Sequence, residues 1–279
     1  MDNTKFKLAG VMGSPVLQSR SPILHNYWLA KYGLKGAYGH FQVEPSNLEA
    51  AIRGLSALGL AGCNITQPHK VAALALMDVV DPVAQRMGAI NCIVVQEDGA
   101  LHGFNNDGYG YIQSLKDVKP DWRADDGPVL VLGAGGAARA VVLSLIDEGA
   151  REIRLTNRSI EKAQALAAGH EAIVKVVPWA ERNAAMDGAA LLVNTTNQGM
   201  YGQPPLDVVL DALPPSAMVS DAIYIPLETP LLAAARLRGH TTVNGLGMLL
   251  NQARPAFKAW FGVMPEITPE LKQAILATF

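Results

Sequence analysis

A single lysine, Lys70, closes a segment of small polar residues that could bind and react with a polar substrate. The segment reads Gly62-Cys63-Asn64-Ile65-Thr66-Gln67-Pro68-His69-Lys70, with a turn proline two residues before the lysine. A lysine can donate a proton to a carbonyl oxygen, or accept one from an alcohol if its surroundings tune its pKa. The ordinary alternative for an isolated lysine is a solvated surface charge. The segment therefore predicts acid–base chemistry on a small polar substrate.

A second motif, Gly133-Ala134-Gly135-Gly136-Ala137-Ala138, follows the apolar run Val129–Leu132 and opens a helical pattern. It fits G-x-G-x-x-G/A, in which the first glycine permits a tight turn and the second lets the backbone approach a pyrophosphate. The helix N-terminus adds free N–H groups and partial positive charge. An ordinary tight turn between a strand and a helix is the alternative. The context predicts a dinucleotide site formed by Gly133, Ala134, Gly135, Gly136 and Ala137.

Residues about 20 positions further along distinguish the two nicotinamide dinucleotides. An NAD site usually carries Asp or Glu there, whereas this chain has Asn157-Arg158-Ser159, with Lys162 one helical turn later. A guanidinium and an ammonium suit a 2′-phosphate, which Arg can bind through two hydrogen bonds. The prediction is NADP. The alternatives are a solvated helix face formed by Arg158 and Lys162, and a different cofactor such as a flavin or a methyl donor.

Hydrophobic periodicity predicts alternating strands and helices along the chain. The expected strands are Phe6–Met12, Ala37–Val43, Leu60–Ile65, Ile90–Val95, Leu101–Phe104, Val129–Leu132, Glu152–Thr156, Ile173–Val177, Ala189–Asn194 and Val219–Ile223. One expected helix opens near Pro22, and the others cover Pro45–Ala57, Pro68–Met77, Pro82–Met87, Asp107–Leu115, Ala137–Glu148, Ser159–Ala168, Thr229–Arg238, Gly245–Trp260 and Pro269–Ala277. This alternation predicts an α/β fold with mostly parallel strands. The polar stretch Lys116–Pro128 is the best local candidate for a connection between domains.

Composition excludes several classes of protein. The 279 residues carry a formal net charge of −2, so there is no basic field to attract nucleic acid. The apolar stretch Val129–Ile146 contains Arg139 and several glycines, which predicts a buried strand, turn and helix and argues against a membrane span. Met1–Lys5 leads into a strand without a signal-peptide pattern, and the two cysteines and six histidines show no metal spacing. We expect a cytoplasmic protein with no metal, membrane or nucleic-acid partner.

Taken together, the motifs resemble the shikimate dehydrogenase family over almost the whole chain. The matching pieces before residue 120 are Gly13-Ser14-Pro15, Ser19-Arg20-Ser21-Pro22, His25-Asn26, the Gly62–Lys70 segment, Ala89-Ile90-Asn91 and Gly103-Phe104-Asn105-Asn106-Asp107-Gly108. The later pieces are the Gly133 turn, Asn157-Arg158-Ser159, Asn194-Thr195-Thr196, Gly199-Met200, Asp221-Ala222-Ile223-Tyr224 before Pro226, and Gly245-Leu246-Gly247-Met248-Leu249 with Gln252. Each piece is modest alone, but so many in this order are specific.

The resemblance implies roles for individual residues. Lys70 and Asp107 are the implied catalytic pair, in which a lysine beside a carboxylate polarises the carbonyl oxygen. Ser19, Ser21 and Tyr224 are implied to bind the substrate carboxylate. The ring hydroxyls would be bound by Asn64, Thr66, Asn91, Asp107 and Gln252, and the nicotinamide side of the cofactor by Thr195, Thr196, Gly245 and Met248. The alternatives are a helix cap for Asp107, an N-cap for Ser21, a turn residue for Asn91 and a core position for Met248.

The resemblance also implies a fold and an activity. A discontinuous substrate domain, residues 1–106 plus 246–279, and a Rossmann-type NADP domain, residues 107–245, would meet at the active-site cleft. The implied reaction is the reversible NADPH-dependent reduction of 3-dehydroshikimate to shikimate, in the pathway to chorismate and the aromatic amino acids. We expect shikimate and 3-dehydroshikimate as the small-molecule partners, and a monomer or homodimer.

Two rival functions share this fold. An NAD-preferring quinate/shikimate dehydrogenase would be expected to carry an acidic residue near Asn157, and a non-catalytic ligand-sensing paralogue would not need the Lys70–Asp107 pair. The chain departs from the usual family pattern at Asn106 (usually Thr), Asn251 (often His), Ser159 (often Thr) and Lys162 (often Arg). Asn106 neighbours Asp107 and could alter the preference between shikimate and quinate. The changes at 159 and 162 could weaken 2′-phosphate binding.

Overall fold

The computed structural model describes residues 5–279, which form two compact units. The first unit comprises the residues up to Asn106 together with Leu250–Phe279, and the second comprises Asp107–Leu249. Residues 1–4 of the N-terminus, for which we expected no signal peptide, lie outside the described residues. The mixed α/β class predicted from the sequence is confirmed, with one six-stranded sheet in each unit.

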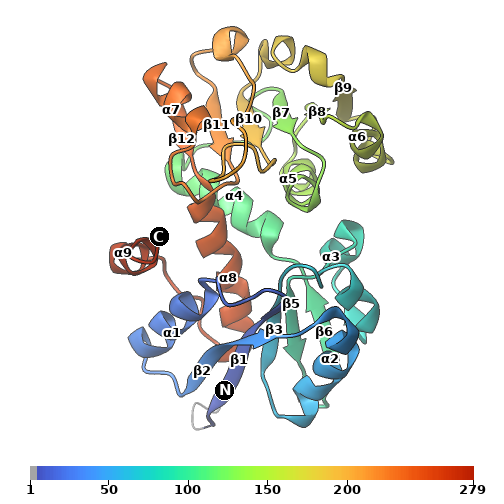
Figure 1. The fold of residues 1–279 in the computed structure, drawn as a ribbon, viewed down its shortest axis with the longest axis vertical. Helices are drawn as coiled ribbons and strands as arrows, with labels where there is room; N and C mark the ends of the chain where they lie inside the picture. The colour runs from blue at the N-terminus through green and yellow to red at the C-terminus, as the bar shows by residue number, and fades with distance from the viewer. Residues whose placement is uncertain (1–4) are drawn as a thin grey trace. The chain divides into compact units, whose positions relative to one another are not determined.

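The first unit has a sheet of strand order β2-β1-β3-β5-β6-β4 (Figure 1). Its strands are β1 (Lys7–Gly13), β2 (Gly36–Gln42), β3 (Gly62–Ile65), β4 (Val79–Val80), β5 (Cys92–Val95) and β6 (Leu101–Phe104). Its helices are α1 (Ser21–Lys31), α2 (Leu48–Ala57), α3 (Pro82–Met87), α9 (Pro269–Leu276) and the last part of α8 (Gly245–Phe261). Strands β2, β1, β3, β6 and β4 run in one direction, whereas β5 runs antiparallel to its neighbours β3 and β6. A short turn joins β5 to β6, and only antiparallel neighbours can be joined that way.

The second unit has an all-parallel sheet of order β12-β11-β10-β7-β8-β9. Its strands are β7 (Val129–Leu132), β8 (Ile153–Thr156), β9 (Val174–Val177), β10 (Leu191–Asn194), β11 (Met218–Asp221) and β12 (Thr241–Val243). Its helices are α4 (Asp107–Val118), α5 (Gly136–Asp147), α6 (Ile160–Ala167), α7 (Pro230–Leu237) and the first part of α8. Counted along this sheet, the order is 3-2-1-4-5-6, which is the order of a Rossmann fold.

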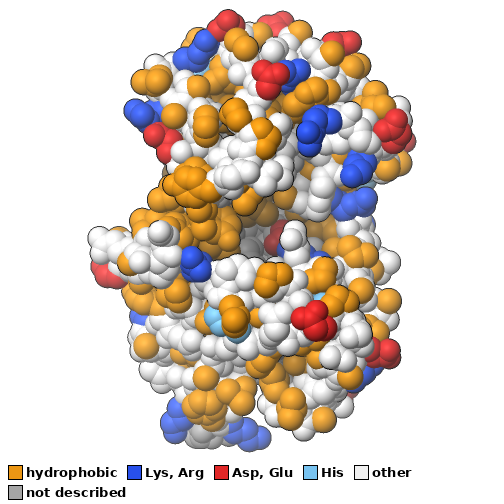
Figure 2. Space-filling model, in the orientation of Figure 1, with side chains coloured by type: hydrophobic (Ala, Val, Ile, Leu, Met, Phe, Trp, Pro, Cys, Tyr) orange, Lys and Arg blue, Asp and Glu red, His pale blue; other side chains and the backbone are white. Residues whose placement is uncertain are grey.

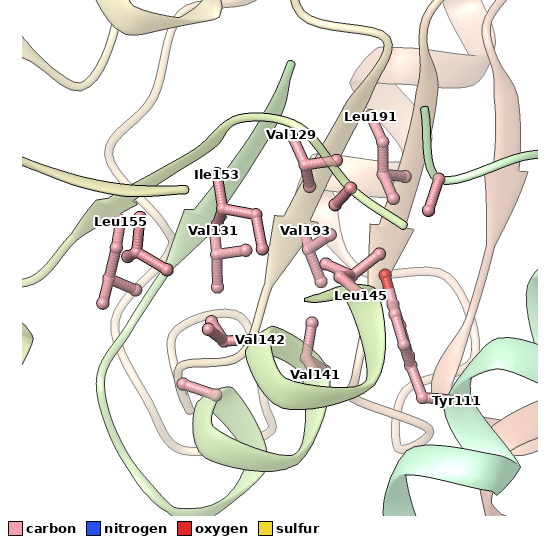
Figure 3. Close-up of a cluster of buried hydrophobic side chains, with 14 of the residues drawn as sticks. Tyr111, Val129, Val131, Val141, Val142, Leu145, Ile153, Leu155, Leu191 and Val193 are labelled. Atoms are coloured by element: carbon pink, nitrogen blue, oxygen red, sulfur yellow. The ribbon is translucent and has the colours of Figure 1, made fainter. Parts of the chain in front are cut away.

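Alternate residues of β7 face two different cores, which explains why the strand is apolar throughout. Val129 and Val131 pack with Val141, Val142 and Leu145 of α5 in one cluster, and Figure 3 shows these side chains meeting between the helix and the strands. Leu130 and Leu132 pack in a second cluster with Leu231, Leu232 and Ala235 of α7. A parallel strand covered on both faces is expected to read as a continuous apolar run.

The sheet of the first unit is also covered on both faces. On one face, Ile52 and Leu55 of α2 pack with Cys63, Ile65 and Ile93 of the strands. The other cluster is aromatic. In it, His25 of α1 stacks on Tyr38 of β2 with ring centroids 4.1 Å apart, and Trp28, Phe257 and Trp260 surround the pair. Burial lowers the pKa of His25 to about 3, so this histidine is a neutral core residue.

The helix expected over Pro68–Met77 is wrong. A turn covers residues 67–71, and a 3-10 helix follows at Ala72–Leu76. The cause is tertiary, because the carbonyl of Lys70 accepts a hydrogen bond from the backbone N–H of Ile90 at 2.9 Å. In an α-helix that carbonyl would serve Leu74, whose N–H instead bonds to Val71. Because the N–H of Ile90 occupies the Lys70 carbonyl, no α-helical bond forms there and Lys70 lies in a turn.

The stretch Lys116–Pro128 does not connect the two units, contrary to expectation. It lies inside the second unit, where its Trp122 and Ala124 are buried in the cluster around α5. The short strands β4 and β12 were not expected, because two or three residues carry too little pattern to read. On the face drawn in Figure 2, acidic and basic side chains are interspersed with apolar and polar ones. None of the helices described between residues 5 and 279 has the length and apolar composition needed to cross a bilayer.

Candidate functional site

A cavity of about 320 Å³ opens in the second unit beside the glycine-rich turn. Its lining includes predicted cofactor residues from three separate segments, namely Gly133, Ala134, Gly135, Asn157, Arg158, Ser159, Lys162, Thr195 and Thr196. These segments directly follow β7, β8 and β10, whose carboxyl ends meet at one edge of the parallel sheet. Ligands bind at this edge in open α/β sheets. The structure therefore brings these predicted residues together around one hollow.

The first glycine of the turn is required by geometry. Gly133 has φ of +108°, which L side chains rarely adopt, and a Cβ there would lie 2.6 Å from the hydroxyl oxygen of Thr195. The second glycine is different. Gly135 has φ of −92°, and a Cβ there would meet no atom within 4 Å. The space above Gly135 is thus open, so the backbone can be approached closely by a phosphate.

Two cations, Arg158 and Lys162, line the cavity where β8 ends, and no carboxylate is among the lining residues. Asn157 takes the position where an NAD site usually has an acid, and its amide donates to the Ser159 carbonyl at 2.8 Å. The Ser159 hydroxyl donates to Glu161 at 2.8 Å. A backbone N–H and the Ser159 hydroxyl lower the pKa of this glutamate, so it stays ionised near neutral pH. The donor set of the cavity fits a phosphorylated ribose.

Three residues of the cavity were not predicted from the sequence: Trp179, Asn197 and Gln198. Trp179 lies in a 3-10 helix after β9, and the Arg182 guanidinium lies over its ring, 4.8 Å from the centroid. Asn197 and Gln198 extend the loop after β10. Tryptophan side chains are usually buried in protein cores, so nothing in the sequence distinguished Trp179 from an ordinary packing residue.

Gly136, Ala137, Gly245 and Met248 are not among the residues that line this cavity. Gly136 and Ala137 begin α5, directly after the turn. Gly245 begins α8, and a Cβ there would lie within 2.1 Å of the Ala222 carbonyl oxygen. Met248 is partly buried and packs against the cluster around α5. Its core packing agrees with the alternative for this residue and leaves any cofactor contact a prediction.

In the first unit, three predicted substrate residues form one hydrogen-bonded group. Asn64, at 6 % exposure, donates through Nδ2 to the backbone carbonyl of Asn91 at 2.9 Å. The Asn91 side chain in turn donates to Oε1 of Gln252 at 3.4 Å and accepts from the N–H of Asn106 at 2.9 Å. Buried amides are retained only where their polar atoms are bonded. This group can therefore present oriented donors and acceptors to a polyol.

Tyr38 joins this group to the predicted carboxylate-binding serines, and sequence reasoning missed it. Its buried hydroxyl donates to Oδ1 of Asn64 at 2.6 Å and is also bonded to the Ser21 side chain. Burial raises the pKa of Tyr38, so the phenol stays protonated. The Ser19 hydroxyl accepts from the N–H of Ser21 at 3.3 Å. The N-cap alternative for Ser21 is wrong, because α1 begins at Ser21 and Arg20 takes the cap position.

Lys70 lies at the end of a segment that the sheet holds in place. The N–H of Thr66 donates to the Met12 carbonyl at 2.9 Å, and Nε2 of His69 donates to the Val43 carbonyl at 2.7 Å. With the bond from Ile90 to the Lys70 carbonyl, these contacts hold the backbone before the lysine and at the lysine itself. Thr66 and the Lys70 side chain are half-buried. Lys70 is thus held by the fold and is not a freely solvated surface residue.

Asp107 and Tyr224 belong to the second unit. Asp107 is the first residue of α4, where the helix dipole stabilises a carboxylate. Tyr224 lies in the irregular segment between β11 and α7 and is half-buried. Between residues 5 and 279, no group of three His, Cys, Asp or Glu side chains could hold a metal ion.

Comparison with known proteins assigns the family. A model of the shikimate dehydrogenase substrate binding domain matches residues 11–93, one of shikimate / quinate 5-dehydrogenase matches 116–201, and one of the shikimate 5′-dehydrogenase C-terminal domain matches 245–276. A shikimate dehydrogenase (NADP(+)) of Rhodospirillum rubrum is 54% identical over 276 residues, which are 98% of each chain. The chain belongs to the shikimate dehydrogenase family. The resemblance inferred from the sequence motifs is confirmed.

Solved structures of the family share the fold. A shikimate 5-dehydrogenase of Thermus thermophilus in complex with NADP(H) and shikimate is 34% identical, with a TM-score of 0.86, and the match covers 98% of this chain and 100% of that one. A quinate dehydrogenase of Corynebacterium glutamicum in complex with NAD is 30% identical, with a TM-score of 0.89, over 98% of this chain and 99% of that one. The family thus contains members with different polyol substrates and different dinucleotides.

The two turn glycines should respond differently to alanine. We expect Gly133→Ala to lower the free energy of unfolding by about 1–3 kcal/mol, because strain at positive φ adds to a clash with Thr195. Gly135→Ala should change it by less than about 0.5 kcal/mol, because the backbone is ordinary and the space is open. Urea unfolding of both variants and the parent measures the difference. Equal losses at the two positions would contradict the geometry described for the turn.

Proposed function

We propose that this protein is a shikimate dehydrogenase, which reversibly reduces 3-dehydroshikimate to shikimate with NADPH. The observation that carries the proposal is similarity along the whole chain to a shikimate dehydrogenase (NADP(+)), at 54% identity. The cavity with Arg158, Lys162 and an open glycine turn supports the cofactor, and the bonded amides of the first unit support a polyol substrate. We propose further that the enzyme is cytoplasmic and acts as a monomer or homodimer.

In this proposal Lys70 is the general acid. When bound, NADPH would supply the hydride that the carbonyl carbon of the substrate receives. The Lys70 ammonium donates a proton to the carbonyl oxygen, so that the ketone becomes an alcohol and the lysine becomes neutral. Asp107 is the second residue of the catalytic pair in this proposal and binds a ring hydroxyl. In the oxidation of shikimate the same lysine accepts the alcohol proton.

The remaining substrate residues act as oriented hydrogen-bonding groups. Asn64, Thr66, Asn91 and Gln252 bind ring hydroxyls, and Ser19, Ser21 and Tyr224 bind the carboxylate. The Tyr38 hydroxyl donates to the amide oxygen of Asn64, and the amide of Asn64 donates one N–H to the Asn91 carbonyl. One N–H and one oxygen lone pair of the Asn64 amide therefore remain for a ligand. A site built to bond several hydroxyls discriminates strongly against analogues that lack one.

The cofactor residues form three groups, each of which binds a different part of the dinucleotide. The turn from Gly133 to Ala137 and the N-terminus of α5 bind the pyrophosphate through backbone N–H groups. Arg158 and Lys162, with Ser159 and Asn157, bind the 2′-phosphate of the adenosine ribose. Thr195, Thr196, Gly245 and Met248 contact the nicotinamide side. The absence of an acid at position 157 favours NADP over NAD and therefore disfavours the NAD-preferring quinate/shikimate dehydrogenase.

The first experiment measures dinucleotide reduction by the purified protein with shikimate or quinate, each with NADP⁺ or NAD⁺. We expect turnover with shikimate and NADP⁺, and a kcat/KM at least about tenfold lower with NAD⁺, because a lost charge-assisted contact is worth about 1.5–3 kcal/mol. Preference for quinate and NAD⁺ would assign the protein to the quinate/shikimate dehydrogenases. Ligand binding without turnover would favour the sensing paralogue.

Removing the Lys70 amine should abolish most of the activity. We expect Lys70→Ala to lower kcat by at least about 100-fold while the melting temperature changes little, because a general acid contributes about 10²–10⁴-fold. Steady-state kinetics with shikimate and NADP⁺ measure the loss. Lys272→Ala, which removes an exposed lysine from α9, is the matched control and should keep wild-type kcat. Near-normal turnover of Lys70→Ala would remove Lys70 from the mechanism.

Removing the Arg158 guanidinium should weaken NADP⁺ and spare NAD⁺. We expect Arg158→Ala to raise the KM for NADP⁺ by about tenfold or more, since a hydrogen bond to a charged group contributes about 1.5–3 kcal/mol. The KM for NAD⁺, which lacks the 2′-phosphate, should change by less than about twofold. Arg151→Ala removes an exposed arginine of the same unit and should alter neither constant. Equal increases for the two dinucleotides would count against the 2′-phosphate assignment.

A further inference from the structure

Asp221 is a buried carboxylate at the end of β11 that forms no ion pair within the described part of the chain. It is 1 % exposed. Its Oδ1 accepts from Nδ2 of Asn194 at 3.1 Å and from the N–H of Ile223 at 3.0 Å, and its Oδ2 accepts from the Thr229 hydroxyl at 2.7 Å. Burial raises the pKa of Asp221, and the three donors act in the opposite direction. A buried charge without a cation is costly, so these donors must all be held in place around it.

The first contact of Asp221 orients Asn194, its register partner on β10. Oδ1 of Asp221 accepts hydrogen bonds from both Asn194 and the N–H of Ile223, so the NH₂ group of Asn194 points toward it. The amide oxygen of Asn194 then faces the other way and accepts from the N–H of Thr196 at 3.0 Å and from its hydroxyl at 2.8 Å. Thr196 lines the cofactor cavity. The Asn194 amide also donates to the Gln198 carbonyl at 3.3 Å, so Asp221 and Gln198 together orient it. Asp221 thereby supports one wall of the cavity without lining it.

The other two contacts of Asp221 hold the segment that carries Tyr224. Ile223 lies directly before Tyr224, and Thr229 lies at the far end of the segment, where its hydroxyl also accepts from the N–H of Leu232 to begin α7. One carboxylate therefore closes the segment from residue 222 to residue 229 into a loop. The position of the Tyr224 backbone depends on this closure.

The start of α8 docks on the same segment. The N–H of Gly245 donates to the Ile223 carbonyl at 2.9 Å, and a Cβ at Gly245 would lie within 2.1 Å of the Ala222 carbonyl oxygen. The chain before Gly245 and the chain after Asp221 are thus in direct backbone contact. Gly245 and Met248 are both proposed to contact the nicotinamide side of the cofactor. Their placement depends on the segment that Asp221 holds.

We propose that Asp221 is a positioning residue for catalysis, which through Asn194 holds the cofactor wall at Thr196 and through Ile223 and Thr229 holds Tyr224 for the substrate carboxylate. The proposal rests on the proposed function, because it takes the roles of Thr196 and Tyr224 from it. Asp221 itself is not among the residues that line the cofactor cavity. Its carboxylate contacts both Asn194, which supports the cofactor wall, and the ends of the segment that carries Tyr224.

The test begins with Asp221→Asn, which keeps the shape and replaces an acceptor by a donor. One of the three donors must then lose its acceptor or turn away. We expect the KM for shikimate to rise about tenfold and the dissociation constant of NADP⁺, titrated without substrate, to rise at least about threefold, effects of the size of one lost hydrogen bond. Glu228→Gln makes the same chemical change at an exposed residue of the same segment and should alter neither constant.

Variants at Thr229 and Tyr224 separate the two contacts. Thr229→Val removes the donor to Oδ2 and the cap acceptor of Leu232, but it keeps the contact between Asp221 and Asn194. It should therefore raise the KM for shikimate and leave NADP⁺ binding unchanged. Thr229→Ser keeps the hydroxyl, so its KM for shikimate should be close to that of the wild-type protein. In a Tyr224→Phe background, Asp221→Asn should raise the KM for shikimate by less than about twofold further, because coupled residues are non-additive. Its effect on NADP⁺ binding should persist in that background.

The outcomes distinguish this proposal from the proposed function. Wild-type kinetic and binding constants in Asp221→Asn, or a lower melting temperature with unchanged constants, would reduce Asp221 to a structural residue and overturn the proposal. Additive effects of Asp221→Asn and Tyr224→Phe would overturn the contact with the Tyr224 segment. If the wild-type protein fails to oxidise shikimate, the proposed function fails. Weaker NADP⁺ binding in Asp221→Asn would still support the contact through Asn194 in that case.

Discussion

The parallel register of β8, β7, β10 and β11 is the constraint on which the second unit depends. It sets Thr156 beside Leu132, Leu132 beside Asn194, and Asn194 beside Asp221 in one row across the sheet. The residue that follows each strand therefore emerges at the same edge. A slip of one residue would exchange the valines and leucines of β7 between the two faces, so that their shapes would no longer fit either core. Burial of those side chains is thus what fixes the position of the glycine turn relative to the cationic loop.

In the first unit, the need to form hydrogen bonds to buried polar groups fixes the orientation of the substrate residues. Asn64 is buried among strands, where an unbonded amide would cost about 1–3 kcal/mol. Tyr38 and the Asn91 carbonyl satisfy one acceptor and one donor of this amide, and in doing so they fix its orientation. Asp221 fixes Asn194 in the same way in the second unit. In both places the cost of leaving a polar atom unbonded orients a buried amide, Asn64 among the substrate residues and Asn194 behind Thr196.

Features formed by adjacent residues could be predicted from the sequence, whereas contacts between residues far apart in the sequence could not. The glycine turn and the cations at Arg158 and Lys162 follow from adjacent residues, and the structure places them around one cavity. Tyr38 and Trp179 escaped prediction, because an aromatic residue near a strand has the same pattern whether it packs in a core or supports a site. The helix expected over Pro68–Met77 failed for a related reason, since its propensity could not reveal that Ile90 binds the Lys70 carbonyl.

The two kinds of site residue differ in how much of their geometry exists before a ligand arrives. Asn64 and Asn91 are nearly inaccessible and bonded on more than one side, so little conformational entropy remains for them to lose on binding. Arg158 and Lys162 are exposed, and their side chains must be ordered when a phosphate binds. Buried amides therefore suit the discrimination of one polyol from another, which requires fixed positions. Exposed cations suit the recognition of a phosphate, whose charge attracts them over a longer distance and tolerates a looser geometry.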